Sequence, residues 1–385
     1  MGSVVLRVDV PNDLIVWARE RSGIERAELA RRFPIEAWEA NTKAPTLRQL
    51  EGYAKATHTP IGFFFLTEPP EEPVPIPDFR TVRDETITRP SPDLLDTIYE
   101  CQQRQEWFRR YAAANEFDPV EFVASATIER APEEVAREMR DSLDFDPGER
   151  GNNWSEAFRT LSEHAEGVGV LVMVNGIVGN NTHRKLDPNE FRGFALVDDL
   201  APTVFVNGAD TKAAQIFTLA HELAHLWLGQ AGLDDLNLGV RTENQVERWC
   251  NAVAAELLVP LELLHRRFRD RGDLVDELDR LAREFKVSTL VILRRLYEAD
   301  YLDWRAFRTA YTDEVARVLE LAEVREGREG GNFYNTQPLR VSKTFARALV
   351  SETLAGRTTY TDAFHLLGLR KSSTLFQLGE HLGVA

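Results

Sequence analysis

Residues 211–229, TKAAQIFTLAHELAHLWLG, form the stretch of sequence on which our prediction of the fold depends. Thr211 can cap a helix at its start and Gly229 can end it, and the apolar residues between them follow helical periodicity. Within this helix His221 and His225 are four residues apart, so both imidazoles point to the same side and can reach one ion. The pattern predicts a helix that presents two metal ligands.

A second predicted helix, residues 243–259, offers a carboxylate with the same spacing. Glu247 and Asn251 lie four residues apart, and the loop before the helix is long enough to turn the chain back antiparallel. We therefore expect Glu247 to be the third ligand. Asn251 is placed to hydrogen-bond the far nitrogen of a ligand histidine and fix its tautomer. Glu243, one turn earlier, is the rival third ligand.

Two imidazoles and one carboxylate leave one tetrahedral position around zinc for water, which is typical of catalytic rather than structural zinc. Glu222 points away from the ligand side but can face that water and take its proton. The sequence thus predicts one Zn²⁺ per chain and peptide hydrolysis with Glu222 as the base. Two other interpretations remain: histidines satisfied by hydrogen bonds in a core, and a metal that stabilises the fold without turnover.

Short β-rich runs and further helices surround this pair. Three strands are expected before the metal-binding helix, at residues 168–174, 191–197 and 202–207. Strand 191–197 can offer a free edge to an extended peptide. The turn at residues 257–260 either walls a side-chain pocket or packs in the core. Helical periodicity is also found in residues 94–114, 132–143, 154–166 and 260–311.

The fold class we predict is mainly α with a small β-sheet (α+β). Residues 1–67 show several short helices with Pro and Gly at their ends, and seven prolines between residues 68 and 93 favour an extended linker. The predicted domains are an all-α domain (1–67), a Pro-rich linker (68–93), a metal-binding domain with preceding helices (94–311) and a helical C-terminal domain (312–385).

The composition bounds the class of protein. The chain has 385 residues, 43% of them hydrophobic, and a formal net charge of -16. Residues 67–304 hold 26 Lys or Arg against 45 Asp or Glu, which argues against a surface that binds nucleic acid everywhere. Two distant cysteines exclude a Cys-based zinc site and favour a reducing compartment. With no apolar run of about 18 residues, we expect a cytoplasmic protein without membrane association.

The segment HELAH (221–225), followed by ERWCNAVAAELLVP (247–260), resembles the ImmA/IrrE family of zinc-peptidase-like bacterial proteins. The resemblance extends upstream through FTLA (217–220). The segments ELARRF, EAWE and PTLRQLE in the first 51 residues resemble an Xre-type helix-turn-helix domain. Residues 77–81, PDFRT, are similar to a segment that joins the two units in long, regulator-like members.

The resemblance implies zinc bound by His221, His225 and Glu247, with Glu222 as the catalytic base. It also implies a protein substrate, such as a transcriptional repressor or toxin-antitoxin partner, in stress response or mobile-element control. His183 is our candidate for stabilising the oxyanion, with an ordinary surface histidine as the alternative.

For the Xre-like domain, the sequence leaves DNA binding open. Segment 34–42, PIEAWEANT, stands where a recognition helix is expected, but Glu36 and Glu39 oppose contact with phosphate. The candidate DNA contacts are Arg31, Arg32, Asn41, Lys43 and Arg48, with Arg26 as a further backbone contact. The alternative is a module that serves partner docking or homodimer formation.

The competing function is a non-catalytic DNA-binding regulator or antitoxin. In that interpretation the zincin-like domain senses a ligand or metal, or binds a protein partner.

Overall fold

The computed structural model describes residues 7–76, 90–148, 150–234, 244–269, 272–323 and 333–384. The chain divides into two compact units, one made of residues 1–75 and 82–98 and the other of residues 76–81 and 99–385. Helices dominate both units, and the strands form one small sheet in the second unit. The predicted class, mainly α with a small β-sheet, is confirmed.

The first unit contains several short helices, as the sequence predicted. They are α1 (Asn12–Ser22), α2 (Arg26–Ala30), α3 (Ile35–Glu39), α4 (Leu47–Ala56) and the short 3-10 helix η1 (Ile61–Phe65). Tyr53 lies at the centre of their core, fully buried, with its hydroxyl donating to the carbonyl of Ile15 over 2.8 Å. The rings of Phe33 and Trp38 contact Tyr53 edge-on. The aromatic core explains why such short helices hold together.

The sheet of the second unit has the strand order β1-β3-β2-β4. Its strands are β1 (Leu171–Asn175), β2 (Gly193–Leu196), β3 (Thr203–Asn207) and β4 (Gly232–Asp234). β1 and β3 are parallel, while β2 is antiparallel to both of its neighbours. The three predicted strands are present, each slightly shorter than expected, and the fourth was not predicted.

The expectation that strand 191–197 offers a free edge is wrong. The chain turns at Gly229 and returns along β2, so that Gly193 pairs with Asp234 and Ala195 pairs with Gly232. β4 has only three residues, too few for a periodic pattern to show in the sequence. The outer strand on this side of the sheet is therefore β4.

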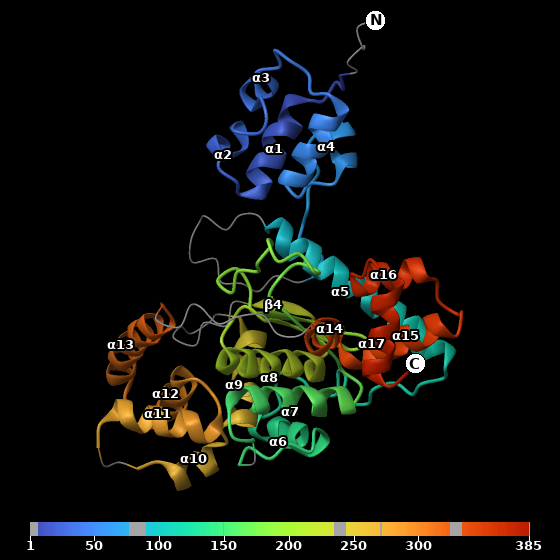
Figure 1. Ribbon diagram of the computed structural model, residues 1–385. Helices are drawn as coiled ribbons and strands as arrows, with labels where there is room; N and C mark the ends of the chain where they lie inside the picture. The colour runs from blue at the N-terminus through green and yellow to red at the C-terminus, as the bar shows by residue number, and fades with distance from the viewer. Residues whose placement is uncertain are drawn as a thin grey trace, which may run out of the picture. The chain divides into compact units, whose positions relative to one another are not determined.

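The helix that the sequence placed at residues 211–229 is α8 (Lys212–Leu228), and it is the centre of the second unit (Figure 1). Every residue from Gln215 to Leu228 is buried, because α8 packs against β2, β3 and the flanking helices α7 and α9. A helix that is apolar on nearly all sides requires such cover. Thr211 caps its start and Gly229, at φ 70°, ends it as predicted.

Helices that precede and follow the strands in the sequence complete the core. Their bounds are α5 (Pro92–Ala114), α6 (Pro132–Ser142), α7 (Trp154–Gly167), α9 (Gln245–Leu258), α10 (Leu261–Arg267), α11 (Leu274–Phe285), α12 (Thr289–Glu298) and α13 (Trp304–Glu323). Leu257, Leu258 and Val259 are fully buried in this core, which favours packing over a pocket wall for the turn at 257–260.

The helix expected to end near Tyr311 continues to Glu323, so the predicted boundary at 311/312 falls inside α13.

The last helices are α14 (Phe333–Val341), α15 (Lys343–Leu354), α16 (Tyr360–Leu367) and α17 (Ser372–Leu382). α14 packs along β1, and Glu166 at the end of α7 fastens the start of α15. The Glu166 carboxylate accepts hydrogen bonds from the Ser342 hydroxyl at 2.5 Å and the Lys343 amide at 2.9 Å. Burial raises the pKa of Glu166, and these hydrogen bonds oppose the rise.

Within the residues that the structure describes, no helix is both long enough and apolar enough to span a bilayer.

Candidate metal centre

The two histidines of α8 lie as their spacing predicted. Their Nε2 atoms are 3.0 Å apart, and both side chains are fully buried. The Nδ1 atom of His225 lies 3.1 Å from the carbonyl oxygen of Gln230, just past the end of the helix. A carbonyl can only accept, so Nδ1 of His225 carries a proton. In the neutral ring Nε2 is then the nitrogen that can bind an ion.

α9 brings the carboxylate of Glu247 to the same point. One oxygen is 3.1 Å from Nε2 of His221 and the other is 3.3 Å from Nε2 of His225. The ligand atoms of the three residues all lie within 4.8 Å of one another. The structure thus joins Glu247 to the two histidines. The rival Glu243 lies outside the described residues.

Burial and charge set the protonation of this group. Burial lowers the pKa of His221, although the hydrogen bond and charge of Glu247 partly oppose the change. For Glu247, burial alone would raise the pKa, but hydrogen bonds with His221 and His225 hold it well below its usual range. A neutral imidazole and an ionised carboxylate are the forms that bind a metal.

The donor set fits a divalent cation. Two imidazole nitrogens and a carboxylate, all buried, converge on one point from two helices. A buried carboxylate and two imidazole lone pairs that face one another cost free energy unless a positive charge lies among them. One cation would bind all three groups. Nitrogen and oxygen donors in this number suit zinc with one open position.

Glu222 also lies in the interior, with 1% of its surface exposed, but it is not one of the three converging residues. Its carboxylate lies against β2 at Gly193. A Cβ added at Gly193 would be 3.0 Å from Oε1 of Glu222, 2.8 Å from the carbonyl of Phe205 and 2.5 Å from the methyl carbon of Thr218. Glycine is therefore required here so that α8 can approach the strand.

Asn251 and His183 were predicted to support the site. Asn251, one turn after Glu247, interacts with His221, and this interaction raises the His221 pKa against the effect of burial. The far nitrogen of His225 is held by a backbone carbonyl instead. His183 is exposed on its loop, as the surface-histidine alternative expects.

Sequence reasoning did not identify Gln230 or Gly193. Gln230 acts through its backbone carbonyl, so its residue type carries no sign of the role. Gly193 resembles any strand glycine until the helix that packs against it is known.

The candidate DNA contacts of the first unit are all on its surface. Arg31, Arg32, Asn41, Lys43 and Arg48 are exposed. Arg26 is exposed as well, but Glu39 holds it in an ion pair at 2.8 Å, so its expected role as a phosphate contact is not supported. α3, where the recognition helix was expected, has only five residues.

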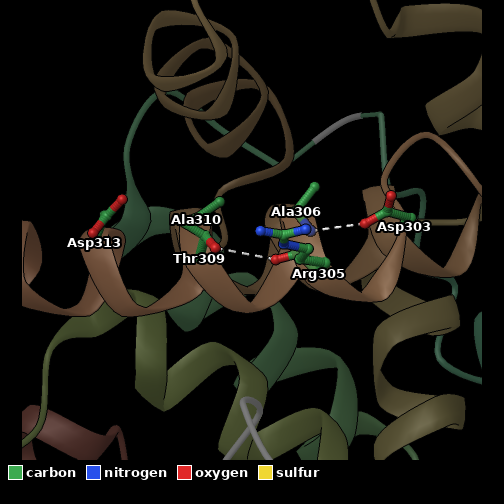
Figure 2. A pocket seen from close by; sticks show the side chains of 6 residues that line it. All are labelled: Asp303, Arg305, Ala306, Thr309, Ala310 and Asp313. Carbon is green, nitrogen blue, oxygen red and sulfur yellow. Dashed lines mark hydrogen bonds between the residues drawn. The ribbon is translucent and has the colours of Figure 1, made fainter.

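A separate hollow lies on the outward side of α13 (Figure 2). Its lining residues are Asp303, Arg305, Ala306, Thr309, Ala310 and Asp313. The Asp303 carboxylate accepts from the amide of Ala306 at 2.8 Å, and the Thr309 hydroxyl donates to the carbonyl of Arg305 at 3.1 Å. These are ordinary contacts of one helix, and most of the side chains are exposed. We assign no function to this hollow.

Comparisons with known proteins agree with the geometry. Residues 165–297 match the IrrE N-terminal-like domain of peptidase family M78. This range contains His221, His225 and Glu247 as well as Glu222. Residues 341–381 match a domain of unknown function (DUF8813).

A curated relative is the radiation response metalloprotease IrrE of Deinococcus deserti. It is 32% identical over 164 residues, which are 41% of this chain and 54% of the relative, so the chain spans about half of that protein's length. Both matches support the ImmA/IrrE resemblance and a metallopeptidase-type domain.

Gly193→Ala tests the close approach of α8 to β2. Because the added methyl would meet Thr218, Phe205 and Glu222, we expect the free energy of unfolding to fall by about 1–3 kcal/mol. Chemical denaturation measures this. Gly167→Ala at the end of α7 is the control, since no heavy atom lies within 4 Å of its added Cβ. Equal effects of the two substitutions would contradict the packing described.

Glu247→Gln tests the third ligand. A neutral amide binds zinc poorly, so we expect zinc affinity to fall more than about 100-fold, since loss of an outer partner already costs roughly 10–100-fold. Competition with a chromophoric chelator measures the affinity. Glu243→Gln should leave it unchanged. If Glu243→Gln instead caused the loss, Glu243 would be the ligand.

Proposed function

We propose that this chain is a zinc-dependent endopeptidase that cleaves a partner regulator, a repressor-like protein, and so controls transcription in a stress-response, mobile-element or toxin-antitoxin-like system. The observation that carries the proposal is the buried convergence of His221, His225 and Glu247 beside Glu222. The matched metallopeptidase domain contains all four residues, which supports the same chemistry.

In the proposed reaction three of the residues are metal ligands and the fourth is the base. His221, His225 and Glu247 hold the ion, and zinc bound there would polarise the scissile carbonyl and lower the pKa of a bound water to about 7. Glu222 takes the proton from the attacking water and returns it to the leaving amine. Because Glu222 is enclosed between α8 and β2, its carboxylate has little freedom to turn away.

The regulatory part of the proposal rests on separate support. The relative in Deinococcus deserti is named a radiation response metalloprotease, which connects a similar domain with stress. In this chain the domain is joined to an all-α first unit that resembles an Xre-type module. A peptidase joined to such a module suits a substrate that is itself a transcription factor.

Glu222→Gln tests the peptidase. The amide keeps the shape of the side chain but cannot accept the proton, so zinc content should stay near one ion per chain while cleavage falls at least about 10²–10⁴-fold. We would express wild type and variant in source cells that lack the gene, and identify new protein N-termini by mass spectrometry.

The matched control is Glu163→Gln, which changes an exposed residue of α7. The control should produce the same new N-termini as wild type. Identical N-termini from the Glu222→Gln cells would refute the peptidase, and so would a wild type that generates none.

A second function, DNA binding by the first unit, has the exposed side chains of Lys43 and Arg48 in its favour. If these residues contact phosphates, the double substitution Lys43→Gln and Arg48→Gln should weaken binding to the chain's own upstream DNA. The slope of log affinity against log salt should fall by about 2. Fluorescence anisotropy between 50 and about 200 mM salt measures both. An unchanged slope favours the docking or homodimer alternative.

A further inference from the structure

The last three helices of the chain pack against one another. α16 ends at Gly368, whose φ of 64° is in the left-handed region, and α17 begins at Ser372. α15 packs on both of them, and the three lie together at the right of Figure 1. Two helices joined by a short glycine-containing turn, with a third helix behind them, form the arrangement of a helix-turn-helix motif.

The interior of this group is mainly apolar, and Phe345 also contacts the ring of Trp107 on α5. Its fully or nearly fully buried residues are Phe345, Ala346, Leu349, Val350, Ala363, Leu366, Leu367, Leu369, Leu375, Leu378 and Leu382. They come from all three helices and from the turn. The burial of Leu369 fixes the turn against the core, so α16 and α17 have a set orientation.

One side of α17 is left on the surface. Ser372, Ser373, Phe376 and Glu380 are exposed, and their spacing places them on the side opposite to the buried leucines. The side chain of Phe376 is 45% exposed, so its ring is accessible to a partner.

The charge of this group differs from that of the chain. Residues 343–382 hold five Lys or Arg against three Asp or Glu, whereas the whole chain has a net charge of -16. Arg370 and Lys371, directly before α17, are exposed, and within the described part of the chain neither forms an ion pair. Arg370 and Lys371 therefore add positive charge at the N-terminus of α17, which is already the positive end of the helix dipole.

The start of α16 adjoins the same surface. The ring of Tyr360, the first residue of α16, lies 6.4 Å from the ring of Phe376, and Tyr360 is 42% exposed. In a helix-turn-helix protein the second helix enters the major groove with its N-terminal residues on the bases, while the first helix crosses the backbone. Tyr360 and Phe376 occupy these two places.

We propose that α15–α17 form a duplex-DNA-binding module in which α17 is the recognition helix. Arg370 and Lys371 contact phosphates, and Ser372, Ser373 and Phe376 face base edges in the major groove. A hydroxyl can donate or accept at a base, and an aromatic ring can pack on the thymine methyl group. The positive charge and the small polar residues at the start of α17 favour DNA over an apolar protein partner.

The module is firmly attached to the rest of the second unit. Nε of Arg104 donates to the carbonyl of Leu366 at 3.0 Å, and the side-chain amide of Gln337 donates to that of Leu367 at 2.7 Å. The amide of Asn180 donates to the carbonyl of Gly368 at 3.0 Å. These donors satisfy the last carbonyls of α16 and hold the turn before α17 in place. DNA bound on α17 would thus be fixed relative to the metallopeptidase domain.

The test is the double substitution Arg370→Gln and Lys371→Gln in the full-length, zinc-loaded protein. The probe is a fluorescein-labelled duplex of about 20 base pairs with mixed sequence, with binding measured by anisotropy across salt concentrations. We expect affinity to fall about tenfold and the salt slope to fall by about 2. The matched control is Lys343→Gln with Arg347→Gln, which removes two exposed charges from α15 and should change neither quantity.

Circular dichroism of both variants checks that the helices remain folded. The proposal is overturned if wild type does not bind the duplex at 50 mM salt, if the α17 pair has no effect, or if both pairs weaken binding equally. Equal or tighter binding of a single-stranded RNA of the same length would also overturn it. Peptidase activity is measured separately, so failure of one proposal leaves the other standing.

Discussion

The structure depends on the burial of two imidazoles and one carboxylate against one another between α8 and α9. His221, His225 and Glu247 are each fully buried, and their ligand atoms lie within 4.8 Å. An apolar core does not tolerate such a group unless a charge balances it. A bound cation both balances the charge and joins the two helices, so the same ion would stabilise the fold and supply the chemistry.

The sheet and the turn after α8 position the remaining groups of the site. β2 allows α8 to come close because residue 193 is glycine, and that approach encloses Glu222. β4 then covers the edge of β2, and the carbonyl of Gln230, two residues before β4, orients His225. The return of the chain after Gly229 therefore serves the sheet and the site together. An extended substrate cannot add directly to β2 along the pairs that β4 occupies.

The sequence was sufficient for the parts of the site that depend on spacing within a helix. Two pairs are spaced four residues apart: His221 with His225 on α8, and Glu247 with Asn251 on α9. Helical geometry alone places the members of each pair on one side of their helix. The sequence could not show which residues meet across elements. Gly193, the carbonyl of Gln230 and the three-residue β4 become visible only when α8, β2 and the returning chain are seen together. The end of the helical region was also placed wrongly: we expected it near Tyr311, but α13 runs through that position to Glu323.

Zinc K-edge X-ray absorption on the purified full-length chain is the most direct test of the central claim. The account predicts one zinc per chain, two imidazole nitrogens at about 2.0–2.1 Å and a light oxygen scatterer at a similar distance. A spectrum with sulfur at about 2.3 Å, or with zinc surrounded by water alone, would contradict it.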